Sequence, residues 1–132
     1  MGILWMLLLL VLLQRDQIRL GEGCLEDERQ ALLKIRDAFN NQNPNRPSYL
    51  PWGTKEMDCC RWDKVTCEPT SKRVTQLYLN GTRDPNLGGW ILNASLFLPI
   101  QDLNVLILSF NQLTVQFDGK MPCIFCCGIH IP

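Results

Sequence analysis

The residues best suited to chemistry are seven cysteines and a single histidine, His130. Three of the cysteines, Cys123, Cys126 and Cys127, lie close to this histidine near the end of the chain. The C-x-x-C spacing is that of half a zinc site, but no second ligand pair accompanies it, so we predict neither a metal site nor another cofactor. A catalytic base at His130 would sit at a chain terminus, which holds geometry poorly. These residues favour a protein that is not an enzyme.

The size and charge of the chain limit the classes of protein to which it can belong. Its 132 residues suffice for one small domain. Thirteen Lys and Arg residues balance thirteen Asp and Glu residues, which gives a formal net charge of zero. An even balance supplies no broad electrostatic attraction to nucleic acid or to an anionic surface. We therefore expect no nucleic-acid partner.

An apolar segment at the N-terminus indicates the compartment. Residues 3–13 form an uncharged apolar run of eleven residues. A membrane-spanning helix needs about twenty such residues, whereas a run of this length is typical of a signal peptide. We predict a signal peptide over residues 1–23 and a secreted product, with an uncleaved signal anchor as the alternative. No second long apolar stretch follows, so we expect no membrane span.

Secretion would determine what the cysteines do, because thiols pair in an oxidising compartment and the bridges stabilise small domains. Four cysteines lie before residue 70 and form an even group: Cys24, Cys59, Cys60 and Cys67. The three near the C-terminus make the total odd, which leaves at least one thiol without a partner inside the chain. Cys59 and Cys60 are adjacent and cannot readily bond to each other, so each must pair elsewhere.

An amphipathic helix is predicted over residues 25–39. Its apolar residues recur at three- and four-residue spacing and form one stripe: Ala31, Leu32, Ile35, Ala38 and Phe39. Acidic residues at positions 26–28 suit the first turn, where the helix dipole favours negative charge. Residues 40–58 are rich in Pro, Asn and Gly, so we expect a loop, with Trp52 as its buried anchor.

Two short segments further along share a pattern. Residues 103–113 match the leucine-rich repeat signature L-x-x-L-x-L-x-x-N-x-L at every specified position. We predict a short strand with buried leucines, followed by an asparagine whose amide bonds the backbone of the turn that leaves the strand. This repeat core is Leu103, Leu106, Leu108, Asn111 and Leu113. Residues 74–79 repeat the first half 29 residues earlier, with Thr82 in place of the asparagine. Two unrelated buried strands are the alternative on this pattern alone.

Together these features resemble the N-terminal part of plant extracellular leucine-rich repeat proteins, which include receptor-like proteins, receptor kinases and polygalacturonase-inhibitor-like proteins. The resemblance rests on Cys24, the helix at 28–39, Trp52, the run Asp58-Cys-Cys-Arg-Trp62 with Val65-Thr-Cys67, and the repeat at 103–113. The segment at residues 93–99 is most similar to the receptor-like proteins. One residue departs from the family pattern, because Lys64 stands where the family usually has glycine.

The resemblance implies an α+β fold in which an N-terminal cap, made of an amphipathic helix and a disulfide-stapled loop, leads into a short, incomplete leucine-rich repeat solenoid. It places the cap at residues 24–68, with disulfides Cys24–Cys59 and Cys60–Cys67. One degenerate and one complete repeat follow at residues 69–114, and we expect residues 115–132 to be an unmatched, disordered tail. Because a stable stack needs about three repeats, we interpret the chain as a truncated form of a longer receptor.

The resemblance also implies a non-enzymatic capping segment of a secreted or cell-surface recognition protein, in defence or developmental signalling. Its ligands would be proteins, peptides or cell-wall carbohydrates, bound by the full repeat array on the concave face of the strands. The matching positions here are Gln76, Tyr78, Ile107 and Ser109. Two strands offer far less than a standard interface, so we expect little affinity from the chain alone. A stand-alone secreted cysteine-rich inhibitor, in which all the cysteines matter, is the alternative.

Two sequons accompany these features. Asn80-Gly-Thr82 and Asn93-Ala-Ser95 both match the N-glycosylation acceptor pattern. Secretion would expose both to glycosylation, so we predict modification at Asn80 and Asn93, unless burial at the strand end blocks Asn80.

Overall fold

The computed structural model describes residues 2–21, 23–41, 50–122, 124–127 and 129–130, without the side chains of residues 12–21, 126–127 and 129–130. The helices are α1 (Gly2–Gly21), α2 (Glu26–Asn40) and the short α3 (Ile124–Cys127), with 3-10 turns at Cys59–Arg61, Pro85–Leu87 and Ala94–Phe97. The strands are β1 (Val65–Cys67), β2 (Val74–Tyr78), β3 (Trp90–Asn93), β4 (Val105–Ile107), β5 (Leu113–Gln116) and β6 (Ile129–His130).

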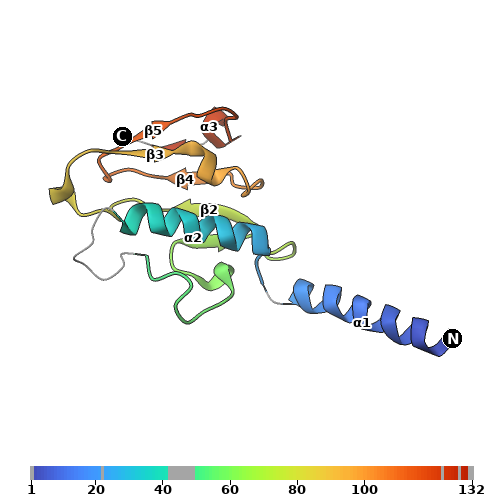
Figure 1. Cartoon of the computed structure of the whole chain (residues 1–132). Coiled ribbons are helices and arrows are strands. Elements are labelled where there is room, and N and C mark those ends of the chain that lie inside the picture. The colour runs from blue at the N-terminus through green and yellow to red at the C-terminus, as the bar shows by residue number, and fades with distance from the viewer. Residues whose placement is uncertain (1, 22, 42–49, 123, 128, 131–132) are drawn as a thin grey trace.

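The N-terminal helix α1 extends away from the rest of the molecule (Figure 1). The large apolar side chains of residues 3–11 are at least half exposed along it. Within the described residues, no helix is both long and apolar enough to cross a membrane. The predicted signal peptide coincides with this helix and stays a prediction.

The strands form two sheets. In the first, the order is β1-β2-β4-β6, with β1 antiparallel to β2 and the other three strands parallel. Leu77 of β2 lies opposite Leu106 of β4, which in turn lies opposite Ile129 of β6. In the second sheet, β3 and β5 are parallel, with Trp90 opposite Leu113. The two segments of the repeat pattern are therefore adjacent layers of one stack, and the interpretation as unrelated strands is wrong.

The helix α2 lies alongside β2 in Figure 1, and its apolar stripe is buried against the stack. Ala31, Leu32, Ile35 and Phe39 are at most 3% exposed, and Ala38 is half-buried. Phe39 meets the indole of Trp90 edge-on, with ring centroids 5.0 Å apart. Each such large apolar side chain, once buried, contributes about 1.5–3 kcal/mol to folding. The helix spans residues 26–40, one residue later than the sequence predicted.

The expectation of a disordered tail over residues 115–132 is wrong where the structure describes that segment. Val115 and Gln116 lie in β5. Ile124 is 5% exposed, and the ring of Phe125 packs on those of Phe97 and Phe117, with centroids 5.8 and 5.2 Å apart.

A third copy of the repeat pattern explains this order. The strand registers Trp90–Leu113 and Leu106–Ile129 both correspond to an offset of 23 residues, within the usual repeat period. At that offset, Cys126 takes the sequence position of Leu103, and Pro122 takes that of Pro99. A search for leucine alone missed the copy because cysteine and isoleucine occupy its core positions.

Candidate functional site

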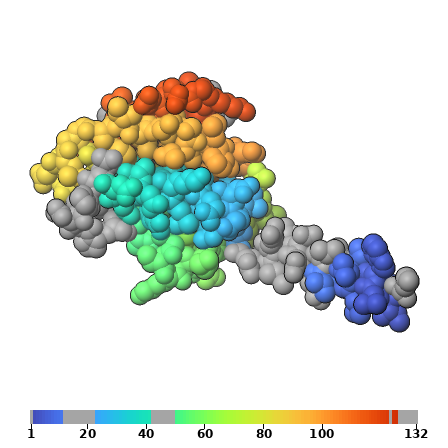
Figure 2. Space-filling model, viewed as in Figure 1, coloured from blue at the N-terminus to red at the C-terminus, as the bar shows by residue number. Residues whose placement is uncertain are grey.

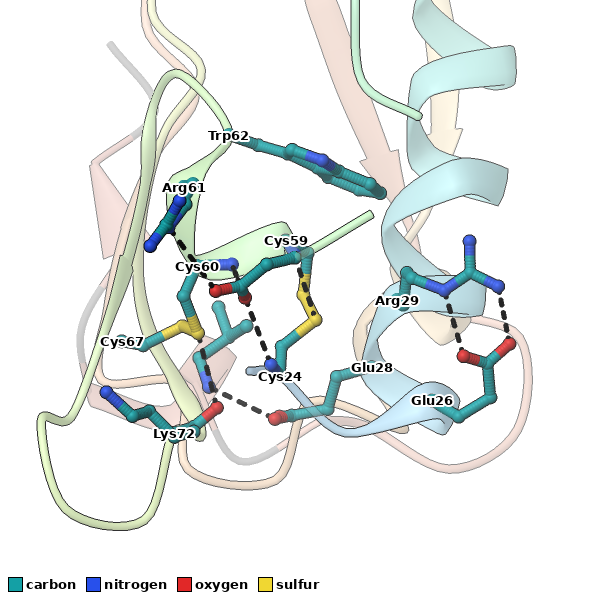
Figure 3. The surroundings of a disulfide bond; sticks show 12 residues. Cys24, Glu26, Glu28, Arg29, Cys59, Cys60, Arg61, Trp62, Cys67 and Lys72 are labelled. Atoms are coloured by element: carbon teal, nitrogen blue, oxygen red, sulfur yellow. Dashed lines mark hydrogen bonds and ion pairs between the residues drawn. A yellow bond between two sulfur atoms is a disulfide. The ribbon is translucent and has the colours of Figure 1, made fainter. Parts of the chain in front are cut away.

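Two disulfides staple the cap beside α2 (Figure 3). Cys24 is bonded to Cys59 and Cys60 to Cys67, with Cα–Cα distances of 5.6 and 5.4 Å. The adjacent cysteines diverge because they lie on a 3-10 turn, which Asp58 caps by accepting the N–H of Cys60 at 3.0 Å. The same carboxylate oxygen accepts the N–H of Cys24 at 3.2 Å. The pairing is the one that the resemblance implied.

A pair of tryptophans fixes the loop that joins α2 to this turn. The rings of Trp52 and Trp62 stack, with centroids 5.8 Å apart and an interplanar angle of 16°. Each indole N–H donates to a loop carbonyl, Trp52 to Asp63 at 2.8 Å and Trp62 to Glu56 at 2.7 Å. The guanidinium of Arg36 on α2 donates to the Trp52 carbonyl at 2.8 Å. The predicted anchor Trp52 is therefore buried and tied to the helix.

At Lys64, where the family usually has glycine, the chain makes a turn with a left-handed backbone. Lys64 adopts a left-handed conformation with φ of 71°, which suits glycine better than a residue with a side chain. Its carbonyl accepts the N–H of Tyr78 at 3.0 Å, and this bond brings the turn alongside β2. The turn therefore carries backbone strain at this position.

A buried carboxylate links the cap helix to the first repeat. Glu28 of α2 is 1% exposed, and its Oε1 accepts the N–H of Val74 at 3.1 Å, whereas Oε2 has no hydrogen-bond partner among the described residues. Burial raises the pKa of Glu28, and nearby Asp102 raises it further, against the Val74 bond and the charge of Arg73, which lower it. The sequence held a signal for this residue, since Glu28 lies four residues before Leu32 on the apolar stripe.

The exposed face of the first sheet contains three of the four candidate binding residues. Gln76 and Tyr78 of β2 lie beside Val105 and Ile107 of β4. Tyr78 is 36% exposed and its hydroxyl donates to the side-chain oxygen of Gln76. The other three side chains are partly exposed. We call Gln76, Tyr78, Val105 and Ile107 the strand face.

Ser109 does not belong to the strand face, contrary to expectation. It is 7% exposed, and its carbonyl accepts the N–H of Gly81 at 2.9 Å, just beyond the end of β4. The 29-residue offset between β2 and β4 takes Gln76 to Val105. That offset, applied to the sequence, would have selected Val105 in place of Ser109.

Asn111 joins the two repeats. Its Oδ1 accepts the N–H groups of Thr82 and Arg83 in the earlier repeat, both at 2.9 Å. Its Nδ2 contacts the carbonyls of Leu79 at 2.7 Å and Leu108 at 2.9 Å. Thr82, at the equivalent position of the first repeat, is buried, and its hydroxyl donates to the Leu79 carbonyl of its own turn. The degenerate repeat thus depends on the asparagine of its neighbour.

The remaining core residues of the repeat lie inside the stack. Leu103, Leu106 and Leu108 are 6%, 0% and 1% exposed. Leu113 is half-buried and begins β5, so it contributes to the second sheet instead of closing the first. The second sheet itself was missed by the sequence analysis, although the alternation of Trp90 and Leu92 is a strand signal.

The two sequons differ in accessibility. Asn80 is exposed just after β2. Asn93 is half-buried, and its Oδ1 accepts the N–H of Ser95 at 3.0 Å. Burial therefore does not block Asn80, and glycosylation of both stays a prediction.

The cysteine cluster near the C-terminus is not fully described. Cys123 and the side chains of Cys126, Cys127 and His130 lie outside the described residues. Among the residues that are described, no group of three His, Cys, Asp or Glu side chains is placed to hold a metal ion. The expectation of no metal site at the cluster stays a prediction.

Comparisons with known proteins agree with this geometry. A model of the leucine rich repeat N-terminal domain matches residues 25–68, which is the stapled cap. Cuscuta receptor 1 of Solanum lycopersicum is 40% identical over 98 residues, covering 69% of this chain and 8% of its own length. Receptor-like protein 9a of Arabidopsis thaliana is 40% identical over 97 residues, covering 73% of this chain and 10% of its own.

A longer alignment reaches into the C-terminal segment. Receptor-like protein 45 of Arabidopsis thaliana is 31% identical over 123 residues, covering 90% of this chain and 12% of its own length. The chain therefore spans about a tenth of the length of the curated relatives that it matches. Cap, repeat register and relatives lead to one conclusion. The chain carries the N-terminal leucine-rich repeat cap of a plant receptor-like protein.

Proposed function

We propose that the chain caps a secreted or cell-surface recognition protein, that it catalyses no reaction, and that ligands of the full repeat array contact the strand face. The observation that carries this proposal is the burial of the α2 stripe on the repeats. A solenoid exposes the apolar layer of its first repeat unless another unit covers it. Here Leu32 and Ile35 are completely buried, and Glu28 bonds directly to the first residue of β2.

The chemistry of the strand face supports recognition. Its four side chains are uncharged, and they combine an aromatic hydroxyl, an amide and two aliphatic groups. Such surfaces bind by shape, apolar contact and hydrogen bonds, as protein and peptide partners require. The relatives are named as receptors or receptor-like proteins, which supports the same role in a longer molecule.

The alternative of a stand-alone cysteine-rich inhibitor has less support. The four cap cysteines are bonded to one another in two pairs. A framework that joined Cys123, Cys126 or Cys127 to the cap would have to break one of these pairs. A recognition cap requires no change in these two disulfides.

Secretion and glycosylation belong to the same proposal. The apolar helix α1 is separate from the packed part of the chain, as a removable signal peptide would be (Figure 1). Two disulfides suit an oxidising compartment. Asn80 is exposed enough to accept a glycan without disturbing the core.

A cap exchange tests the proposal. In the experiment, residues 24–68 replace the corresponding N-terminal segment of Cuscuta receptor 1, and the amount of soluble, monodisperse ectodomain secreted by plant cells is measured. We expect the chimera to be secreted at a level similar to that of the unmodified receptor, because its first repeat stays covered.

Two matched variants control the exchange. Leu32→Asp places a charge on the buried stripe and should abolish secretion of soluble chimera, whereas Lys34→Asp changes an exposed residue of the same helix and should not. Equal secretion of the Leu32→Asp and unmodified chimeras would contradict the capping role.

A further inference from the structure

The backbone nitrogen of Cys24 lies against a carboxylate of the cap. It donates to Oδ1 of Asp58 at 3.2 Å, and the same oxygen accepts the N–H of Cys60 at 3.0 Å (Figure 3). Two features hold this nitrogen in place. Cys24 is bonded to Cys59, and the helix α2 begins only two residues later, at Glu26. The cap itself therefore fixes where this nitrogen lies.

The surroundings of this nitrogen favour a positive charge. Residues 24–27, 29 and 56–58 line an open hollow beside it, which includes the carboxylates of Glu26, Asp27, Glu56 and Asp58. Arg29 is ion-paired with Glu26 at 2.6 Å, and the guanidinium of Arg61 lies 3.9 Å from the carboxylates of Glu56 and Asp58. Among the described side chains, two cations thus face four carboxylates, and a third cation would be attracted here.

The residue before Cys24 suits both a signal peptidase and this carboxylate. Gly23 has a φ of 95°, and a side chain at this position would overlap the carboxylate of Asp58. Signal peptidase requires small residues just before the bond that it cleaves. Gly23 and Gly21 occupy the first and third positions before the bond to Cys24. Cleavage at this bond would leave a free amine at the nitrogen that Asp58 already binds.

The segment that this cleavage removes lies outside the packed part of the chain. Figure 2 shows residues 2–11, in blue, at one end of the molecule, away from α2 and the repeats. Among the described residues, the hydrophobic core contains none before Ala31, and Cys24 is the first residue that packs against it. Removal of the described part of this segment therefore leaves the core of the cap intact.

We propose that cleavage before Cys24 creates an N-terminal ammonium that forms an ion pair with Asp58, which makes this carboxylate the binding site of the mature N-terminus. The inference rests on the secretion part of the proposed function. In the cleavage, water adds across the peptide bond, so that Gly23 gains a carboxylate and the nitrogen of Cys24 becomes an ammonium. A hydrogen bond with one charged partner then becomes a bond between opposite charges, which is stronger in a partly buried site.

The ion pair makes the stability of the processed cap depend on pH. A free α-amino group has an ordinary pKa of about 7.7–8.0, and a carboxylate beside it favours the charged form and raises that pKa. The folded chain then binds this proton more tightly than the unfolded chain does. The contribution of the ion pair is therefore fully present below about pH 7.7 and is lost as the pH rises through the raised pKa.

The test examines the α-amino group of the full chain, expressed in insect cells with its own N-terminal segment and purified from the medium. Mass spectrometry of the N-terminal peptide should find Cys24 as the first residue. Trace acylation of the folded protein across about pH 6–10, a range that brackets an ordinary α-amino group, gives the pKa of the amine. In Asp58→Asn, that pKa should fall by about one unit, so the amine should react about tenfold faster at about pH 7.

Three features of the design isolate the ion pair. Asp58→Asn keeps an oxygen that can accept the N–H of Cys60, and peptide mapping checks that both disulfides still form. Asp58→Ser is a second variant, because a serine hydroxyl also caps a turn, and it should lower the pKa of the amine in the same way. Asp63→Asn removes the same charge from an exposed residue of the same loop and should leave the amine unchanged.

The possible failures can be told apart. A secreted chain whose first residue is not Cys24 would overturn the proposal. An amine that titrates alike in the unmodified chain and in both Asp58 variants would overturn it as well. A full-length chain retained inside the cells would contradict secretion itself, and this inference with it.

Discussion

Asn111 sits where the two repeats meet, and its amide contacts the backbone of both. The sequence predicted bonds to its own turn, because an asparagine after a strand commonly satisfies the turn that follows. The bonds to Thr82 and Arg83 were not predictable from one repeat. They depend on the stacking of the two layers, in which Leu77 lies opposite Leu106.

We predict that Asn111→Ala lowers the free energy of unfolding by about 3 kcal/mol, because several buried N–H and carbonyl groups lose their partner. Chemical denaturation followed by tryptophan fluorescence measures this change. Asn104→Ala, at an exposed position just before β4, is the control and should shift stability by less than about 0.5 kcal/mol. Equal effects of the two variants would contradict the role given to Asn111.

At Lys64, substitution by glycine should stabilise the protein. A left-handed backbone costs a residue with a side chain roughly 1–2 kcal/mol, and glycine avoids this cost. Glycine also raises the conformational entropy of the unfolded chain, which offsets part of the gain in stability. We expect Lys64→Gly to raise the free energy of unfolding by about 0.5–1 kcal/mol. Lys64→Ala removes the same charge but keeps the strain, so it should give no such increase. Denaturation midpoints of the three proteins decide between strain and charge.

The burial of the Glu28 carboxyl group predicts that the stability of the protein depends on pH. Burial raises its pKa above the ordinary value of 4.5, so the folded chain holds this proton more tightly than the unfolded chain. Stability must then fall as the pH rises from about 4.5 through the raised pKa. Glu28→Gln keeps an acceptor for the Val74 N–H and should remove this fall. Denaturation of both proteins across that range should show the stability of the variant increasing relative to that of the unmodified chain as the pH rises. A difference in stability that does not change with pH would refute the prediction.

At the scale of elements, the helix was easier to predict than the second sheet. The apolar stripe of α2 repeats over four turns, so its helical period is clear. Each end of the helix differs by one residue from the prediction. The strands β3 and β5 have four residues each, too few for a period to stand out. Their pairing connects residues 23 positions apart, and only the stacking of repeats brings them together.

The two disulfides should stabilise the cap unequally. The Cys24–Cys59 bridge joins residues 35 positions apart, whereas Cys60–Cys67 joins residues seven apart. Because a longer closed loop removes more entropy from the unfolded chain, the first bridge should contribute about 4 kcal/mol and the second about 2 kcal/mol. We expect the double variant Cys24→Ser/Cys59→Ser to unfold at lower denaturant than Cys60→Ser/Cys67→Ser. The reverse order would show that native packing, not loop length, dominates.

For the whole molecule, the sequence predicted the architecture at its N-terminal end better than at its C-terminal end. The cap cysteines, Trp52 and the stripe of α2 are distinctive residue types at distinctive spacing. The third copy of the pattern has Ile129 in place of a leucine, and its register appears only when β6 lies beside β4. Physical stacking, which tolerates any apolar residue of suitable size, identifies this copy where the leucine signature does not.

The central claim is that the cap covers the first repeat, and hydrogen exchange of the secreted chain before and after disulfide reduction tests it most directly. In the oxidised protein, the amides of Ala31–Phe39 in α2 and of Leu77–Tyr78 in β2 should both be protected. Reduction should remove protection from both segments together, because loss of the cap exposes the layer beneath it. Undiminished protection of β2 after α2 has lost its own would contradict the claim.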